Sequence, residues 1–181
     1  MNPEDARDPV ILETYHADWR QVFEREARML RQVLAPYAIS GIEHVGSTAI
    51  VGMTAKPVVD IMVGTDDPAN IPDRYHPIWS SLGYQWGHGD DDEDGWLFFI
   101  KRNEQGKRLA HIHVVPFEGP FWSKTIKFRD ALRADPKLAE KYRALKIDLA
   151  SKHVNDRLRY LDGKAPFVAS VISGPRSPEF D

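Results

Sequence analysis

The feature that most constrains the fold is a change in hydrophobic period along the chain. Apolar residues recur at helical spacing near both ends, whereas the middle breaks into short runs rich in β-branched and aromatic residues. Such runs, separated by connections that contain Gly and Pro, are typical of strands. Strands are therefore expected at 39–45, 58–63, 96–101 and 109–115, with a weaker fifth at 84–86. The pattern predicts an α+β fold in which a sheet of about five strands is flanked by helices.

The first helices can be placed from their apolar stripes and end signals. A helix of about four turns is expected before Pro36, with Asp18 as its N-cap. Its stripe consists of Trp19, Val22, Phe23, Leu30, Val33 and Leu34. A shorter helix is expected near residues 75–82, and residues 103–106 predict a hairpin turn.

The helical period returns after Pro120 in three successive segments, which predicts a C-terminal helical half. Asp135 stands before Pro136, so it is expected to cap the second of these helices. Gly174 is expected to end the third.

Length and composition indicate one domain. The chain has 181 residues, of which 42% are hydrophobic, so we expect a single domain over residues 1–174 and a flexible tail over 175–181. The sequence contains neither a long apolar segment nor a basic N-terminal region of the signal-peptide type, so we expect a cytoplasmic protein without membrane contact. The absence of cysteine leaves His, Asp and Glu as metal ligands and favours Mg²⁺ or Mn²⁺.

Charge is unevenly distributed. The net charge is −3, yet residues 101–164 carry sixteen Lys and Arg against eight Asp and Glu, a local charge of +8. Such a segment could attract phosphates, or its basic residues could simply be the solvated sides of amphipathic helices. The acidic run Asp90-Asp91-Asp92-Glu93-Asp94 is interpreted as a solvated loop. With a negative total and no recognised motif, nucleic acid is not expected as a partner.

A small-residue turn and a lone acid suggest a phosphate site. Gly46-Ser47-Thr48 follows the first expected strand, and Asp60 lies within the second. A Gly-Ser turn lets backbone N–H groups and a hydroxyl approach phosphate oxygens, and a carboxylate on the next strand can hold the cation that neutralises them. Lys56, on the connection between them, is a candidate for contact with developing charge.

Strand alternation groups the polar side chains of this region. Asp60 faces away from the row formed by Val59 and Ile61, and it serves either a functional site or a structural salt bridge. His111 and His113 share one face of a later strand, as metal ligands or as half-exposed polar residues. If the two strands are neighbours, the three side chains form a cluster.

A series of motifs runs in order through the chain. They are Glu43-His44-Val45-Gly46-Ser47-Thr48-Ala49, Gly52, Ala55-Lys56-Pro57, Asp60-Ile61, Leu82-Gly83-Tyr84, Phe98-Phe99, His111-Ile112-His113-Val114, Phe128-Arg129-Asp130-Ala131-Leu132-Arg133, Pro136, Tyr142, Leu145-Lys146, Arg157, Tyr160, Lys164 and Phe167. This series resembles the GrpB family over residues 15–172, almost the whole chain. The resemblance implies a nucleotidyltransferase-like fold with a mixed sheet. A related domain is attached to dephospho-coenzyme A kinase, where it is thought to help folding.

The resemblance also implies site residues. The nucleotidyltransferase signature is Gly-Ser followed by Asp-x-Asp or Asp-x-Glu, but Met62 stands at the second acidic position. A thioether is a poor Mg²⁺ ligand, so two-metal catalysis is in doubt. The expected substitute is one cation on Asp60 with His111 or His113, joined by Glu43 unless Glu43 pairs with an arginine.

Basic residues of the C-terminal half are the remaining candidates for nucleotide binding. Arg129 and Arg133 lie four apart, and Arg157 and Lys164 seven apart with Tyr160 between them, so either pair could clamp a polyphosphate. The alternative is salt bridges with nearby acids such as Asp130. Lys146 completes the set by its place in the family motifs.

Three functions compete at this point. The first is an enzyme that transfers a nucleotidyl or phosphoryl group from a nucleoside triphosphate to a small acceptor, with Asp60 and Lys56 as catalytic residues. The second is a module of the same fold that binds a nucleotide or a protein partner without turnover, which Met62 favours. The third, a hydrolase with a histidine-bound metal, rests on His111 and His113 alone.

Overall fold

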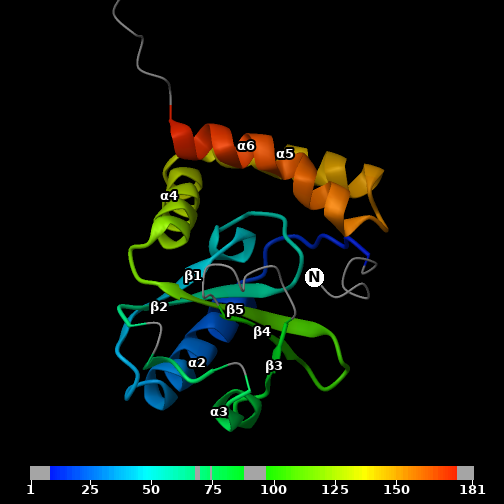
Figure 1. The fold of residues 1–181 in the computed structure, drawn as a ribbon. Coiled ribbons are helices and arrows are strands. Elements are labelled where there is room, and N and C mark those ends of the chain that lie inside the picture. Colours follow the sequence, from blue (N-terminus) through cyan, green and yellow to red (C-terminus); the bar gives the residue numbers. More distant parts are fainter. Residues whose placement is uncertain (1–8, 68–69, 74, 88–96, 175–181) are drawn as a thin grey trace, which may run out of the picture.

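A computed structural model describes residues 9–67, 70–73, 75–87 and 97–174. Its elements, in chain order, are α2 (Asp18–Val33), β1 (Ile39–Val45), the 3-10 helix η1 (Ser47–Ala49), β2 (Val59–Thr65), α3 (Pro77–Ser81), β3 (Tyr84–Trp86), β4 (Leu97–Arg102), β5 (Arg108–Pro116), α4 (Pro120–Ala134), α5 (Pro136–Lys152) and α6 (Arg157–Ser173). The sheet lies in the middle, with α2 and α3 on one side and α4, α5 and α6 on the other (Figure 1). We call these the closed face and the open face of the sheet.

The sheet is mixed, as the sequence predicted. Its strand order is β1-β2-β5-β4-β3, and β2 and β5 are parallel while the other neighbours are antiparallel. All five strands lie within two residues of the expected positions. The turn between β4 and β5 is the expected hairpin, in which Asn103 Oδ1 accepts hydrogen bonds from the backbone of Gln105 and Lys107. The parallel pairing places Asp60 directly beside His111, so the histidine strand is a neighbour of the Asp60 strand.

The closed face holds the main apolar core. Ala27, Leu30 and Leu34 are fully buried against Ile61 and other strand residues. Asp18 is not the N-cap that the sequence predicted. Ala17 occupies that position and Asp18 lies in the first turn, because backbone bonds reaching back to His16 and Ala17 already form the start of the helix. An acid in the first turn still complements the helix dipole.

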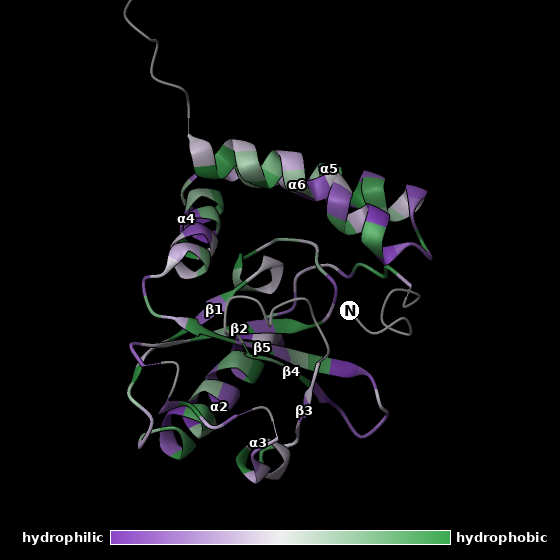
Figure 2. Cartoon of the chain, in the orientation of Figure 1, coloured by the Kyte–Doolittle hydropathy of each residue, from purple (hydrophilic) through white to green (hydrophobic). Residues whose placement is uncertain are grey.

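The C-terminal helices have the expected ends. Asp135 caps α5 by accepting hydrogen bonds from the backbone N–H groups of Lys137 and Leu138. Gly174, with a φ of 70°, ends α6. Hydrophilic and hydrophobic residues alternate along α5 and α6 (Figure 2), as expected for helices with one buried side.

Some sequence expectations lie outside the described residues. They are the tail at 175–181, the acidic run Asp90–Asp94 and the first residue of the strand expected at 96–101. Within the described part of the chain, no helix is long and apolar enough to cross a membrane.

Candidate functional site

The Gly46-Ser47 turn and Asp60 meet on the open face of the sheet. Gly46 directly follows β1 with a φ of 69°, a conformation that suits glycine, and a side chain there would collide with the carboxylate of Asp60. Glycine is therefore required both by the backbone and by the close approach. Gly46, Ser47 and Asp60 line one cavity of about 210 Å³, which we call the lysine pocket after the residues described below.

Two arginines of α4 hold the ends of this turn. Arg129 Nη1 donates to His44 O at 3.0 Å, before the turn, and Arg133 donates to Ala49 O at 2.8 and 3.1 Å, after it. Arg129 is also paired with Glu43 at 2.6 Å and Asp130 at 2.8 Å. Neither arginine lines the lysine pocket, and the structure shows the salt bridges that the sequence offered as the alternative to a phosphate clamp. Both position the turn.

Asp60, His111 and His113 form the cluster that strand alternation predicted. His111 Nδ1 lies 3.1 Å from Asp60 Oδ1, and His113 Nε2 lies 3.9 Å from the same oxygen. Burial would raise the pKa of the Asp60 carboxyl group, but hydrogen bonds from His111 and His113 outweigh it and hold that pKa below its usual range. Burial lowers the pKa of His111, so a neutral ring donates from Nδ1 to the carboxylate. His111 Nε2 is buried and has no hydrogen-bond partner among the residues that the structure describes.

The cluster brings together only part of the predicted metal-ligand set. Glu43 forms the alternative arginine pair and does not line the pocket. No three His, Asp or Glu side chains within the described residues are arranged to hold a metal ion by themselves. Asp60 is the one acid among the described residues of the pocket wall.

Three lysines converge on the same cavity. Lys56 comes from the β1–β2 connection, Lys146 from α5 and Lys164 from α6, and Arg157 at the start of α6 joins them. Burial, helped by Arg157 and Lys164, lowers the pKa of Lys56 to about 7. Burial likewise lowers the pKa of Lys146 to about 7 and that of Lys164 to about 8, the latter despite the charge of Asp60. Among the described residues of its wall, the pocket thus holds four basic side chains and one carboxylate.

Two tyrosines support the lysines, and sequence reasoning gave them no such role. Lys164 Nζ lies 4.5 Å from the ring centre of Tyr160, and Lys146 Nζ lies 5.0 Å from that of Tyr142. Each tyrosine precedes its lysine by four residues on a helix, which places both on one side. This repeated Tyr-x-x-x-Lys spacing in α5 and α6 is the signal that could have predicted the pocket. Lys146 also donates to Thr54 O.

Met62 lies on the open face but not in the pocket. Its side chain is fully buried with Val45, Val115 and Trp122, the last contributed by α4. A carboxylate at this position would be enclosed by apolar side chains without a partner. The missing second acid is therefore replaced by packing between the sheet and α4.

Thr48 faces a second and larger cavity. Its hydroxyl lies 3.0 Å from His44 Nε2, and burial lowers the pKa of His44 to about 4. The ring of His44 stacks on Phe23 with their centres 4.8 Å apart. These residues line a cavity of about 660 Å³ with Arg133, on the other side of η1. Thr48 borders both cavities, although its hydroxyl is engaged with His44.

Comparison with known proteins identifies the family. The sequence profile described as GrpB protein matches residues 9–173, most of the chain. The chain belongs to the GrpB family. The glutamate-rich protein GrpB of Alkalihalophilus pseudofirmus is 32% identical over 166 residues, which are 91% of this chain and 94% of the relative. A UPF0157 protein of Pseudomonas aeruginosa is 35% identical over 94% of this chain and 69% of its own length.

The GrpB fold has also been seen in a crystal. The structure of conserved protein GrpB from Enterococcus faecalis matches with a TM-score of 0.78 and 28% sequence identity, over 90% of this chain and 95% of that one. The family resemblance and the α+β fold predicted from the sequence are thus confirmed. None of these three GrpB-family names states a reaction or a ligand.

Proposed function

We propose that the lysine pocket binds the phosphate chain of a nucleoside triphosphate together with one Mg²⁺ or Mn²⁺ ion. The observation that carries this proposal is the convergence of Lys56, Lys146 and Lys164 beside the Gly46-Ser47 turn. Buried lysines whose pKa values are lowered gain most from a ligand with dense negative charge, because the ligand restores the protonated form. Polyphosphates are ligands of this kind.

The residues have separate roles in this proposal. Ser47 and the backbone of Gly46 contact phosphate oxygens, and Asp60, whose carboxylate lies where a side chain at position 46 would be, holds the cation beside them. Lys146 and Lys164 neutralise the charge of the phosphates from the side of α5 and α6, and Lys56 does so from the connection before β2. Arg129 and Arg133 act indirectly by holding the turn.

The donor set fits one cation rather than two. The ionised carboxylate of Asp60 is a hard ligand, and His111 or His113 adjoins it. A bound cation would supply further neutralisation of phosphate charge, with phosphate oxygens completing its ligands. Met62 offers no second carboxylate, so the two-metal arrangement is not part of the proposal.

The corresponding reaction is nucleotidyl transfer to a small acceptor. A hydroxyl oxygen of the acceptor would form a bond to the α-phosphorus as the bond to the β-phosphate bridging oxygen breaks, releasing pyrophosphate and the hydroxyl proton. Lys56 is proposed to stabilise charge on the departing group. This function would place the GrpB chain in the cytoplasm, where nucleoside triphosphates are made.

Calorimetric titration with ATP in the presence and absence of Mg²⁺ tests the binding. Lys164→Gln should weaken ATP binding about tenfold or more, since a charge-assisted hydrogen bond contributes about 1.5–3 kcal/mol. Lys141→Gln, on the exposed side of α5, is the matched control and should leave the affinity unchanged. Asp60→Ala should reduce the affinity in Mg²⁺ towards that measured without the metal. Equal affinities in wild type and Lys164→Gln would contradict the proposal.

A second candidate follows from Met62. The apolar packing of Met62 under Trp122 leaves Asp60 as a lone signature acid, which favours a module that binds a nucleotide or a protein partner without turnover. Pyrophosphate release in the presence of candidate acceptors separates the two. ATP binding without release across a broad acceptor panel would favour the module.

A further inference from the structure

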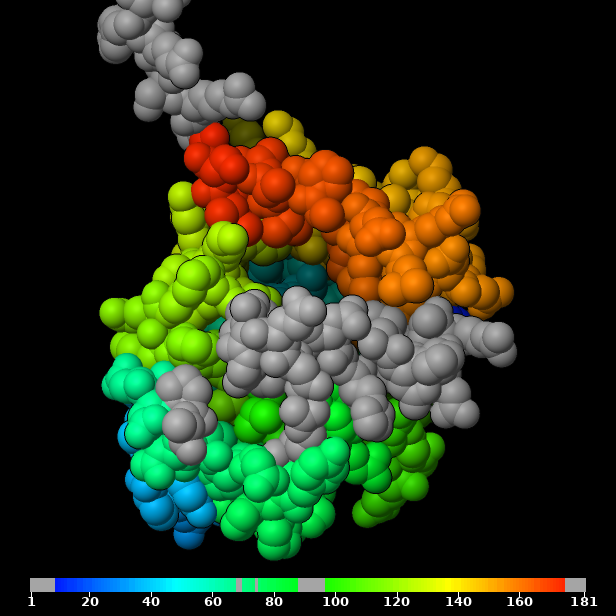
Figure 3. All heavy atoms as spheres, in the orientation of Figure 1, coloured from blue at the N-terminus to red at the C-terminus, as the bar shows by residue number. Residues whose placement is uncertain are grey.

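A groove along α6 adjoins the lysine pocket. Its wall includes one side of α6 at helical spacing, together with Tyr142 of α5 and Lys124 of α4, and its volume is about 470 Å³. The α6 residues are Leu161, Lys164, Ala165, Val168, Ala169, Ile172 and Ser173. In Figure 3 the surface is hollowed between α4 and α6. We call this cavity the α6 groove.

The groove and the lysine pocket adjoin each other. Tyr142, Leu161 and Lys164 line both of them. A ligand that contacts Lys164 from the pocket is therefore within reach of the groove wall. The pocket alone, at about 210 Å³, is below the usual range of about 300–1,000 Å³ for small-molecule sites, whereas the groove adds the missing space.

The chemistry of the groove differs sharply from that of the pocket. Val168 and Ile172 are only half-buried, and Ala165 and Ala169 are exposed. None of these four joins an apolar cluster formed by the residues that the structure describes. The polar side chains on this wall are the two lysines, Ser173 at its end, and Tyr142. The wall thus offers apolar contact and an aromatic ring, with few groups that could form specific hydrogen bonds with the edge of a ligand ring.

We infer that the α6 groove takes the base of the nucleotide whose phosphates occupy the lysine pocket, and that it accepts the base by its apolar faces with little selectivity between adenine and guanine. This inference rests on the proposed function. Small side chains at positions 165 and 169 leave room for a flat ring system, and Lys164 lies where the charged and apolar parts of such a ligand meet. Selectivity between purines needs donors and acceptors aimed at the base edge, and the described wall supplies few.

The experiment compares ATP, GTP and inorganic tripolyphosphate by calorimetry on the full chain. ATP and GTP should bind within about threefold of each other, and both about tenfold tighter than tripolyphosphate, since stacking contributes about 1–3 kcal/mol per base, equivalent to about 5- to 150-fold. Ala169→Trp, which fills the groove at an exposed position, should remove the advantage of the nucleotides while leaving tripolyphosphate binding unchanged. Ser170→Trp, also exposed but off the groove wall, should change neither.

The outcomes distinguish this inference from the proposed function. If wild type binds none of the three compounds, the proposed function fails and the inference with it. If all three bind equally, or Ala169→Trp leaves the nucleotide advantage intact, the groove assignment is wrong while phosphate binding stands. If the affinity for ATP exceeds that for GTP by more than about tenfold, the protein recognises the hydrogen-bonding edge of the base. The inferred lack of selectivity is then refuted.

Discussion

The two faces of the sheet differ in how their buried charged side chains are paired. On the closed face, Glu26 is almost fully buried, and its carboxylate accepts hydrogen bonds from Tyr84 at 2.6 Å and Lys101 at 2.8 Å. On the open face, three lysines share one cavity with Asp60, the single acid among the described residues of its wall. The closed face pairs its buried charge with protein partners through one oxygen of the carboxylate. Among the described residues, the pocket on the open face has more basic groups than acids, which an anionic ligand would balance.

This difference indicates where the proposed ligand would raise the stability of the chain. Buried charges without an oppositely charged partner lower the stability of the free protein, and a ligand that pairs with them recovers the loss. Surrounding structure must then hold such groups in place. Here α5 and α6 place Lys146 and Lys164 against tyrosine rings, and α4 fastens the Gly46-Ser47 turn.

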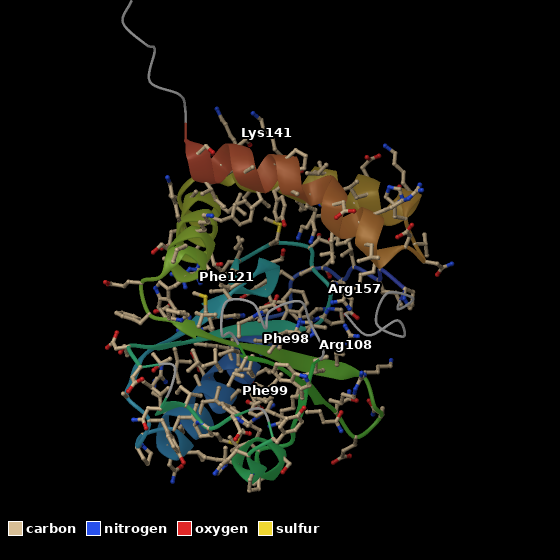
Figure 4. All side chains as sticks on the ribbon, in the orientation of Figure 1. Phe98, Phe99, Arg108, Phe121, Lys141 and Arg157 are labelled. Carbon is tan, nitrogen blue, oxygen red and sulfur yellow. The ribbon has the colours of Figure 1, made fainter. Side chains whose placement is uncertain are left out.

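The largest expected loss of stability is for a substitution in β4, where two adjacent phenylalanines face opposite sides of the sheet. Phe99 is fully buried on the closed face and stacks on Trp79, whereas Phe98 points to the open face and contacts His111 and His113 (Figure 4). Phe99→Ala should destabilise the fold by about 3–5 kcal/mol through cavity formation. Phe98→Ala should cost clearly less but should weaken ATP binding. Urea denaturation and calorimetry on both variants check this, and equal losses of stability would remove the distinction between the faces.

Glu26 tests whether the closed face depends on its paired charge. Glu26→Ala leaves Tyr84 and Lys101 without their shared acceptor and should cost about 2–3 kcal/mol. Glu26→Gln keeps an oxygen for the Tyr84 hydroxyl, so it should cost less. Nucleotide affinity should remain that of wild type in both when measured well below their melting temperatures. A specific loss of affinity in Glu26→Gln would show that the faces are coupled.

The lysines of the open face predict an unusual dependence of stability on pH. The pKa of Lys146 is about 7 in the folded protein against 10.5 ordinarily, so between these values the unfolded chain binds a proton that the folded chain does not. The free energy of unfolding should therefore rise with pH over this window, and the effect is absent below pH 7, where both states are protonated. Lys146→Met should flatten the rise by at most about 1.4 kcal/mol per pH unit.

The matched control for that measurement is Lys141→Met. Lys141 lies on the exposed side of the same helix, and in Figure 4 its label marks the outer edge of the molecule. Denaturation curves at several pH values should superimpose on those of wild type. A slope that changes equally in both variants would mean that Lys146 has no special protonation in the folded state.

The smallest effect is expected for the arginine that fastens the turn. Arg133→Ala removes two hydrogen bonds to Ala49 O and should cost about 1 kcal/mol or less, because the side chain is partly exposed. Nucleotide affinity should fall further than stability, since the turn is then held at one end only. Arg143→Ala, which breaks a surface pair with Glu140, should alter neither property. Unchanged nucleotide affinity in Arg133→Ala would argue against a positioning role.

Much of the fold followed from local patterns. Period-two runs located all five strands, including the short one at Tyr84–Trp86, and the Asp135 cap located the start of α5. The error at Asp18 was also local, because an acid in a first turn and an acid at an N-cap leave similar signals in a sequence. The sequence predicted that the two histidines lie beside Asp60 only if their strands are neighbours. In the structure β2 and β5 are paired in parallel, which fulfils that condition.

Local sequence patterns predicted less of the candidate site than of the fold. Glu43, Arg129 and Arg133 look in the sequence like ligands for a metal or a phosphate. In the structure Arg129 pairs with Glu43, and both arginines bond to the backbone at the ends of the turn. A charged side chain can face a ligand or a protein partner, and the choice depends on which element packs above it.

By itself, the sequence determined the strands, the helices, the alternation that turns Asp60 and Met62 to one face, and the family. These features depend on neighbours within a few residues, whose spacing decides which side chains share a side. Only the tertiary structure decided that Met62 is buried under Trp122 while Asp60 lines a pocket, and that Lys56 shares the pocket wall with Lys146 and Lys164, at least 90 residues later in the sequence. The reason is physical: packing of α4, α5 and α6 over the sheet determines which polar groups are buried together, and burial sets both their charge and their partners.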